Sequence, residues 1–221
     1  TGTGPISSTQ WQFNAGQVTN RCVAGFVTDT AASANLPGVY ASSVAWGDYD
    51  NDGDLDILLT GEDSGGGRQA LIYENQAGVF VTDTAGSANL TGVAYGSVAW
   101  GDYDNDGDLD ILLTGLDSDN GFNALVYENR AGVFVTDTVA SANLTGVYFS
   151  SVAWGDSDND GDLDILLTGT PGGFNGVAYV YENTGSGFVT DVAASANLTG
   201  VYAGSVAWGD YDNDGDLDIL L

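Results

Sequence analysis

The chain is poor in several residue types, and each shortage excludes a class of protein. No histidine is present among its 221 residues, which removes the commonest general base and a frequent metal ligand. The single cysteine, Cys22, cannot form an intrachain disulfide. Only three residues are basic against 31 that are acidic, so no cationic surface exists for nucleic acid or an anionic membrane. No apolar run approaches the length of a membrane-spanning helix.

What the chain has in abundance is one acidic segment that returns at a constant interval. Residues 44–59 read Val-Ala-Trp-Gly-Asp-Tyr-Asp-Asn-Asp-Gly-Asp-Leu-Asp-Ile-Leu-Leu, and close copies occupy 98–113, 152–167 and 206–221. The first aspartate of each copy is residue 48, 102, 156 or 210, so the period is 54 residues. A fixed period of this size indicates a repeat protein.

The five aspartates of each copy have a spacing that suits a divalent cation. Carboxylates at loop positions 1, 3 and 5 can converge on one point, and glycine at position 6 permits a sharp turn. Position 7 would add a backbone carbonyl and position 9 a further carboxylate, a set of hard oxygen ligands that predicts about four Ca²⁺ ions per chain. The predicted ligands are Asp48, Asp50, Asp52, Asp54, Asp56, Asp102, Asp104, Asp106, Asp108, Asp110, Asp156, Asp158, Asp160, Asp162, Asp164, Asp210, Asp212, Asp214, Asp216 and Asp218.

This loop differs from that of an EF-hand. Position 12, a bidentate glutamate in an EF-hand, is Leu59 here, and the flanking apolar runs predict strands in place of helices. A turn made acidic only for solubility is disfavoured. Gathered carboxylates repel one another by roughly 1 kcal/mol per pair even in water, and no loop contains a lysine or arginine.

Residues 96–115, Gly-Ser-Val-Ala-Trp-Gly-Asp-Tyr-Asp-Asn-Asp-Gly-Asp-Leu-Asp-Ile-Leu-Leu-Thr-Gly, resemble an FG-GAP/VCBS repeat, the blade unit of integrin-alpha-type β-propellers. The resemblance extends over nearly the whole chain. It implies an all-β propeller of four-stranded antiparallel blades, in which the acidic loop joins the first two strands and holds Ca²⁺. The family usually has seven blades, which this chain does not supply.

The residue pattern of each repeat predicts four short strands, and the whole of 1–221 is predicted to be one domain. In the copy that begins at Ser43 the strands are expected at about 43–48, 55–60, 70–75 and 79–83, with 84–96 crossing to the next copy. Full blades are predicted at 43–84, 97–138 and 151–191. Apolar runs such as Ile57-Leu58-Leu59 do not alternate, so both faces of each sheet should be covered. The tryptophans before the loops are expected to pack between blades: Trp46, Trp100, Trp154 and Trp208.

The two ends of the chain predict complementary half-blades. Residues 1–30 match strands three and four of a blade, and 205–221 match strands one and two. Their pairing would close a ring and remove exposed sheet edges. One chain could close on itself as four blades, which the high effective concentration of an intrachain pair favours. Alternatively, two chains could exchange half-blades and form an eight-bladed homodimer. The seven-bladed relatives favour this alternative, because the rotation between their successive blades is closer to that of eight blades than to that of four.

The sequence leaves two functions open. The first is an extracellular or cell-surface binding or adhesion module with structural Ca²⁺, whose ligand is a glycan or an extracellular protein; millimolar Ca²⁺ outside cells would fill even weak sites. Loops 62–69, 116–123 and 170–176 vary between copies, and variable loops on a regular frame commonly carry binding. The second is a scaffold, or an amplified or engineered repeat, that binds only Ca²⁺. An enzyme is not expected, because no motif offers a nucleophile or general base and the acidic clusters are committed to metal.

Overall fold

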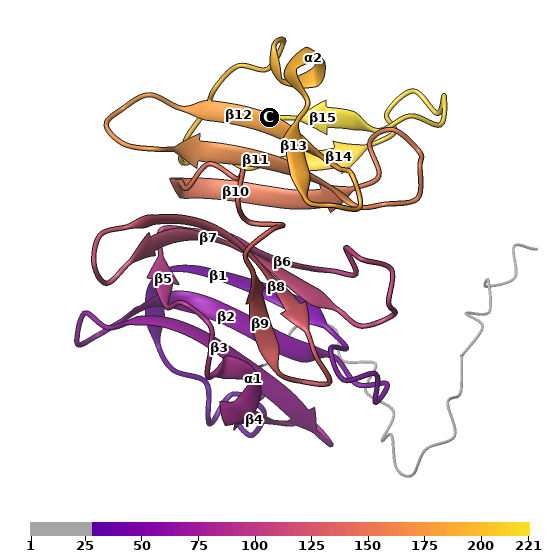
Figure 1. The fold of residues 1–221 in the computed structure, drawn as a ribbon. Coiled ribbons are helices and arrows are strands. Elements are labelled where there is room, and N and C mark those ends of the chain that lie inside the picture. Colours follow the sequence, from indigo (N-terminus) through magenta and orange to yellow (C-terminus); the bar gives the residue numbers. More distant parts are fainter. Residues whose placement is uncertain (1–27) are drawn as a thin grey trace, which may run out of the picture. The chain divides into compact units, whose positions relative to one another are not determined.

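The computed structural model describes residues 28–221, of which Ala31–Leu221 form one unit (Figure 1). The predicted N-terminal half-blade over residues 1–30, which includes Cys22, falls almost entirely outside the described residues. The pairing of that half-blade with the C-terminal one therefore stays a prediction.

Within the described residues, the 54-residue period produces four successive groups of strands, here called repeats 1 to 4. Repeat 1 contains β1 (Val39–Gly47), β2 (Asp56–Asp63), β3 (Arg68–Gln76) and β4 (Val79–Asp83). Repeat 2 contains β5 (Val93–Ala94), β6 (Val98–Gly101), β7 (Asp110–Asp117), β8 (Phe122–Asn129) and β9 (Phe134–Asp137). Repeat 3 contains β10 (Tyr148–Gly155), β11 (Asp164–Thr170), β12 (Val177–Asn183) and β13 (Phe188–Thr190). Repeat 4 contains β14 (Ala207–Gly209) and β15 (Asp218–Leu220).

The predicted all-β class with antiparallel strands is confirmed. Every pair of adjacent strands in the described residues is antiparallel, and repeats 1 to 3 each contain the four predicted main strands. In repeat 1 the fourth strand has the predicted bounds, whereas the first begins at Val39, four residues early. The closure of a ring and the number of blades remain predictions.

The crossing segments contain structure that the sequence did not predict. Asp83 caps the one-turn helix α1 (Thr84–Ser87) by accepting the N–H of Ala85, and Asp191 caps α2 (Val192–Ser195) in the same way. The two-residue strand β5 pairs with both β3 and β7, so it joins the sheets of repeats 1 and 2. No helix among the described residues is long and apolar enough to cross a membrane.

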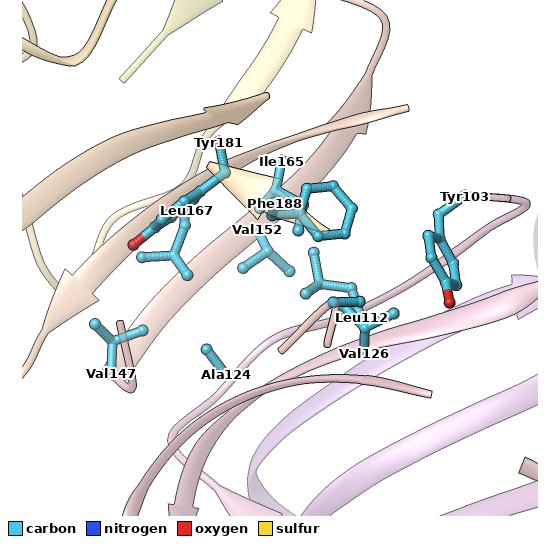
Figure 2. Packing of buried hydrophobic residues seen from close by; sticks show 11 residues of the cluster. Tyr103, Leu112, Ala124, Val126, Val147, Val152, Ile165, Leu167, Tyr181 and Phe188 are labelled. Carbon is cyan, nitrogen blue, oxygen red and sulfur yellow. The ribbon is translucent and has the colours of Figure 1, made fainter. Parts of the chain in front are cut away.

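The core lies between successive repeats. Ile111, Leu112 and Leu113 are consecutive in β7 and all fully buried, although neighbouring side chains of a strand point to opposite faces. Ile111 and Leu113 belong to a cluster shared with repeat 1, whereas Leu112 belongs to one shared with repeat 3. Figure 2 shows Leu112 and Val126 facing side chains of repeat 3. The predicted coverage of both sheet faces is confirmed for repeat 2.

From repeat 2 onward, the tryptophan before the loop packs against a glycine of the preceding repeat. A Cβ added to Gly47 would lie 2.7 Å from Cδ1 of Trp100, and one added to Gly101 would lie 2.6 Å from Cδ1 of Trp154. Gly155 and Trp208 repeat the arrangement. The predicted packing between blades is therefore confirmed for three tryptophans. Trp46 is 57% exposed, because no described repeat precedes it.

Candidate metal centres

Each acidic loop follows the first main strand of its repeat and leads into the second. In the first loop, Asn51 at position 4 has φ 59° and Gly53 at position 6 has φ 96°. Both angles lie in the left-handed region, which glycine and asparagine enter at the lowest cost. A Cβ on Gly53 would meet no atom within 4 Å, so the backbone angle, not a lack of space, requires glycine. The other three loops have the same angles to within a few degrees.

This turn directs backbone N–H groups at the carboxylate of position 1. The N–H of Asp52 and the N–H of Gly53 each donate to one oxygen of Asp48 at 3.0 Å. Equivalent pairs of hydrogen bonds hold the first aspartate of the other loops. These hydrogen bonds hold the loop around its first carboxylate without an ion.

The carboxylate of position 9 is held by the neighbouring strands. Asp110, at the start of β7, accepts the N–H of Tyr103 at 3.2 Å and the N–H of Asn129 in β8 at 2.8 Å. Asp56 has the same two donors in repeat 1, and both aspartates are only 1% exposed. Position 9 is thus a rigid, buried carboxylate on the sheet, as its predicted role in closing the site requires.

The carboxylates of positions 1, 3 and 9 come together in every loop. In each group, one oxygen of each residue lies within 4.8 Å of the others. The groups are Asp48, Asp50 and Asp56; Asp102, Asp104 and Asp110; Asp156, Asp158 and Asp164; and Asp210, Asp212 and Asp218. In the first three, position 3 is exposed, position 1 is partly exposed and position 9 is buried. Each group thus opens toward solvent on one side.

The side chains of positions 5 and 7 do not belong to these groups. Asp52, at position 5, accepts the N–H of Asp54 at 2.9 Å. From repeat 2 onward, the carboxylate of position 7 accepts a hydrogen bond from the preceding repeat. The sequence assigned position 7 a role through its backbone carbonyl, which leaves its side chain available for that bond. Eight residues therefore remain predicted ligands whose carboxylates stand apart from the groups: Asp52, Asp54, Asp106, Asp108, Asp160, Asp162, Asp214 and Asp216.

A family model described as FG-GAP-like repeat matches residues 48–113 and 168–221, which together make up more than half of the chain. The chain belongs to the FG-GAP-like repeat family. Both matched segments contain an acidic loop, so the family match and the grouped carboxylates fall on the same part of the repeat.

Among solved structures, this FG-GAP-like protein is similar to a lectin of Agrocybe aegerita, reported for its specific recognition of non-reducing terminal N-acetylglucosamine. The TM-score is 0.51 and the sequence identity 17%. The alignment covers 80% of this chain but 46% of the lectin chain, so this chain spans less than half of the lectin's length. This structural similarity supports the fold described above. A comparison with curated proteins found no match.

Burial sets the electrostatics of position 9 in the first two of these FG-GAP-like loops. It raises the pKa of Asp56 to about 6 and that of Asp110 to about 7, although two backbone N–H donors on each carboxylate act in the opposite direction. Burial, followed by the charge of Asp106, also raises the pKa of Asp104 at position 3. These groups carry their negative charge at an energetic cost that a cation would remove.

No cationic side chain compensates these carboxylates in the described part of the chain. Its two ion pairs join Arg68 to Glu62 and Arg130 to Glu128, and neither involves a loop aspartate. The donor set consists only of hard oxygen atoms, one of them buried in each of the first three loops, with an open side that water could complete. These properties fit Ca²⁺, which takes six to eight oxygen ligands in flexible geometry.

A hydrogen bond between the loops of successive FG-GAP-like repeats was not predicted. Nδ2 of Asn51 donates to Oδ1 of Asp108 at 3.0 Å, and Nδ2 of Asn105 donates to Oδ1 of Asp162 at 2.8 Å. Asn159 and Asp216 repeat the contact at 3.0 Å. The signal in the sequence was that position 4 is asparagine in all four copies, although no ligand role was assigned to it. The loops are therefore connected to one another in a row.

Position 2 connects each loop to another part of the repeat. Tyr103 is buried, and its hydroxyl donates to Oδ2 of Asp137, the last residue of β9, at 2.7 Å; Tyr49 makes the equivalent bond in repeat 1. Ser157 replaces this tyrosine in repeat 3, and its hydroxyl donates to Oδ2 of Asp164 at 2.5 Å. The one substitution within the four loops thus keeps a hydroxyl donor but directs it to the position-9 carboxylate.

Proposed function

We propose that this FG-GAP-like chain binds Ca²⁺ at its four acidic loops and that the ions have a structural role. The observation that carries this proposal is the recurrence, in four loops, of three aspartates whose oxygens lie within 4.8 Å of one another, with no ion pair to an arginine or lysine of the described residues. The loops contain no histidine and no cysteine, so oxygen is the only ligand type that they offer. Ca²⁺ is the common biological ion that such a set suits best.

The ion would act on stability because it joins elements that are distant in the chain. The carboxylates of positions 1 and 3 lie in the loop, and that of position 9 lies at the start of the following strand and accepts an N–H from the third strand. A cation shared by these carboxylates would hold loop and sheet together and would neutralise the buried charge. A ligand that binds only the folded state adds about 2.7 kcal/mol at a concentration 100 times its Kd.

Thermal melting of two charge-matched variants tests this role. Asp110→Asn removes a buried carboxylate of a proposed site, whereas Asp119→Asn removes the same charge from an exposed turn outside the loops. We expect Asp110→Asn to raise the melting temperature in chelator, because it removes an uncompensated buried charge, and to reduce the gain that Ca²⁺ produces. Asp119→Asn should retain the full gain. Melting curves of the wild-type protein that overlay with chelator and with millimolar Ca²⁺ would contradict the proposal.

We further propose that the chain functions by binding, without catalysis, outside the cell or at its surface, and that its ligand class is a glycan. The fold is shared with a lectin, and FG-GAP-like repeats suit the Ca²⁺-rich exterior of cells. The second candidate is a scaffold that binds nothing but Ca²⁺, which the near-identity of the four loops favours. A glycan array probed with and without Ca²⁺ separates them: signals on the array support the glycan-binding function, and silence under both conditions supports the scaffold.

Closure into a ring is the finer part of the proposed fold. Each repeat contacts the next through the same hydrogen bonds and the same tryptophan–glycine packing, so the contact is head-to-tail and can propagate until a ring closes. A four-bladed monomer and an eight-bladed homodimer both satisfy this condition. Light scattering distinguishes them, because the first gives the mass of one chain and the second that of two.

A further inference from the structure

Four aromatic rings form a continuous row at the end of the strands opposite the acidic loops. Phe122, at the start of β8, stacks on Tyr148 with ring centroids 4.8 Å apart, and Tyr148 contacts Phe149 at 4.8 Å. Phe149 meets Tyr95 edge to face at 5.1 Å. Phe122 and Phe149 remain 40% and 38% exposed. Rings from repeats 2 and 3 therefore present a joint aromatic surface to solvent.

The backbone holds two of these rings in an unfavourable conformation. Tyr95 has φ 55° and Phe149 has φ 48°, a region that bulky side chains rarely enter. A chain of hydrogen bonds between repeats fixes them: the N–H of Tyr95 donates to the carbonyl of Ala41 at 2.9 Å, and the N–H of Phe149 donates to the carbonyl of Tyr95 at 2.6 Å. The N–H of Ala203 donates to the carbonyl of Phe149 at 2.8 Å and extends this row of hydrogen bonds. Strained residues held by their surroundings in this way concentrate at functional sites.

The identity of the residue at this position varies between repeats, although its backbone conformation does not. Position 41 and its three equivalents are Ala41, Tyr95, Phe149 and Ala203, all with φ between 48° and 55°. Because alanine occupies the same conformation twice, the repeat does not need an aromatic ring there to fold. Tyr95 and Phe149 therefore contribute something that packing does not demand.

These residues line a shallow cavity of about 500 Å³ where the first strands of the repeats meet. Its walls include the rings of Tyr40, Tyr95 and Phe149 and the serines Ser42 and Ser150. None of its lining residues is charged, although the chain carries a net charge of −28. The carboxylate of Glu62 lies beyond the wall, where it accepts the hydroxyl of Tyr40.

We propose that this cavity is a glycan-binding site that takes an uncharged sugar ring. Aromatic side chains offer a flat apolar face and, in tyrosine, a polar tip, which together match the apolar face and the hydroxyl groups of a pyranose. Serine hydroxyls at the rim can donate and accept hydrogen bonds with the sugar. The strongly negative chain repels anionic saccharides such as sialylated ones. This inference rests on the glycan binding proposed above and adds its location and the charge of the sugar.

A glycan array of neutral and sialylated glycans tests the site with three proteins. Tyr95→Ala combined with Phe149→Ala removes both strained rings and installs the residue that Ala41 and Ala203 show to be compatible with this backbone. Tyr211→Ser is the control: Tyr211 is 81% exposed in the fourth acidic loop, at the opposite end of the strands, and the third loop already has serine there. We expect the wild type and the control to bind neutral glycans, and the double variant to lose at least tenfold in affinity.

The outcomes separate the site from the function. Equal binding by the wild type and the double variant, or a preference for sialylated glycans, would overturn this site while leaving glycan binding intact. Silence from all three proteins would overturn the glycan-binding function itself.

A second measurement needs no variant. In a titration of the wild-type protein with methyl glycosides of glucose, galactose and their N-acetylated amines, the amide NMR signals of Tyr95, Phe149 and Ala203 should shift first. Shifts confined to the acidic loops would overturn the assignment.

Discussion

At the scale of single residues, the buried position-9 carboxylate is the feature that most distinguishes these loops from ordinary acidic turns. Asp110 is 1% exposed and has two backbone N–H donors, yet its pKa is raised because burial outweighs both. A buried carboxylate held by two hydrogen bonds adds little to the stability of the folded chain unless a cation compensates its charge. Asp110 therefore indicates a metal site more directly than the exposed aspartates around it.

Without calcium, the folded protein should become more stable as the pH falls from 7.5 to 5. The pKa values of Asp56 and Asp110 are raised from 3.8 to about 6 and about 7, so the folded state binds more protons than the unfolded state between these limits. Stability then decreases as pH rises through that window. Thermal melts in chelator across this range check the sign. With Ca²⁺ the trend should reverse, since protons compete with the ion. A melting temperature in chelator that decreases as the pH is lowered from 7.5 to 5 would contradict the prediction.

The asparagine at position 4 should contribute to stability through the next repeat. Asn105 has φ 60° and donates to Asp162. Changing the two partners separately and together isolates the bond from the local preference of asparagine for this backbone angle. We expect Asn105→Ala to reduce the free energy of unfolding in Ca²⁺ by about 1 kcal/mol more in the wild type than in the Asp162→Ala variant. Equal losses in urea denaturation would show that the contact contributes nothing.

At the scale of elements, the contact between successive repeats depends on a glycine at the end of the first main strand. Gly47, Gly101 and Gly155 each lie beneath a tryptophan of the following repeat. Among the described residues no repeat follows Gly209, and no described atom lies within 4 Å of a Cβ added there. The same local sequence, Ala-Trp-Gly-Asp, precedes all four loops. The packed glycines let two sheets approach closely, which side chains at that point would prevent.

The close approach predicts an unequal response to two glycine substitutions. In Gly101→Ala the new Cβ would lie 2.6 Å from Cδ1 of Trp154, so the indole must shift. We expect a loss of about 1–3 kcal/mol in the free energy of unfolding, as for other overpacked sites. Gly65→Ala, in an exposed turn where the new Cβ would come no closer than 3.2 Å to a side-chain oxygen of Asp63, should change it by far less. Urea denaturation of the two variants measures the difference, and comparable losses would argue against close packing as the reason for glycine.

Much of the fold could be predicted from the sequence because its signals are local and repeated. The strands flanking the loops, the covered faces of β7 and the packing of Trp100 and Trp154 follow from apolar runs and a fixed period. The position-4 hydrogen bond and the strand β5 could not be predicted, because both depend on how one repeat meets the next. The arrangement of the position-5 carboxylates apart from the groups could not be predicted either, since spacing alone does not say which side chains bond within the loop.

At the scale of the whole molecule, the charge of −28 is concentrated in the loops, which hold five aspartates each. The position-4 asparagines link the loops in a row. A change in the charge of one loop therefore alters the electrostatic potential at the next. Ca²⁺ would reduce this repulsion in every repeat at once. The aromatic cavity lies at the other end of the strands, among uncharged residues, so its occupancy can be tested separately from that of the loops.

Equilibrium dialysis against radioactive Ca²⁺ shows whether the loops bind the ion, because it counts bound ions without reference to stability or to any other ligand. At millimolar free Ca²⁺ we expect about four ions per chain, one for each carboxylate group, and one fewer in the Asp110→Asn variant. A count indistinguishable from zero at that concentration would contradict the assignment of these loops as metal centres.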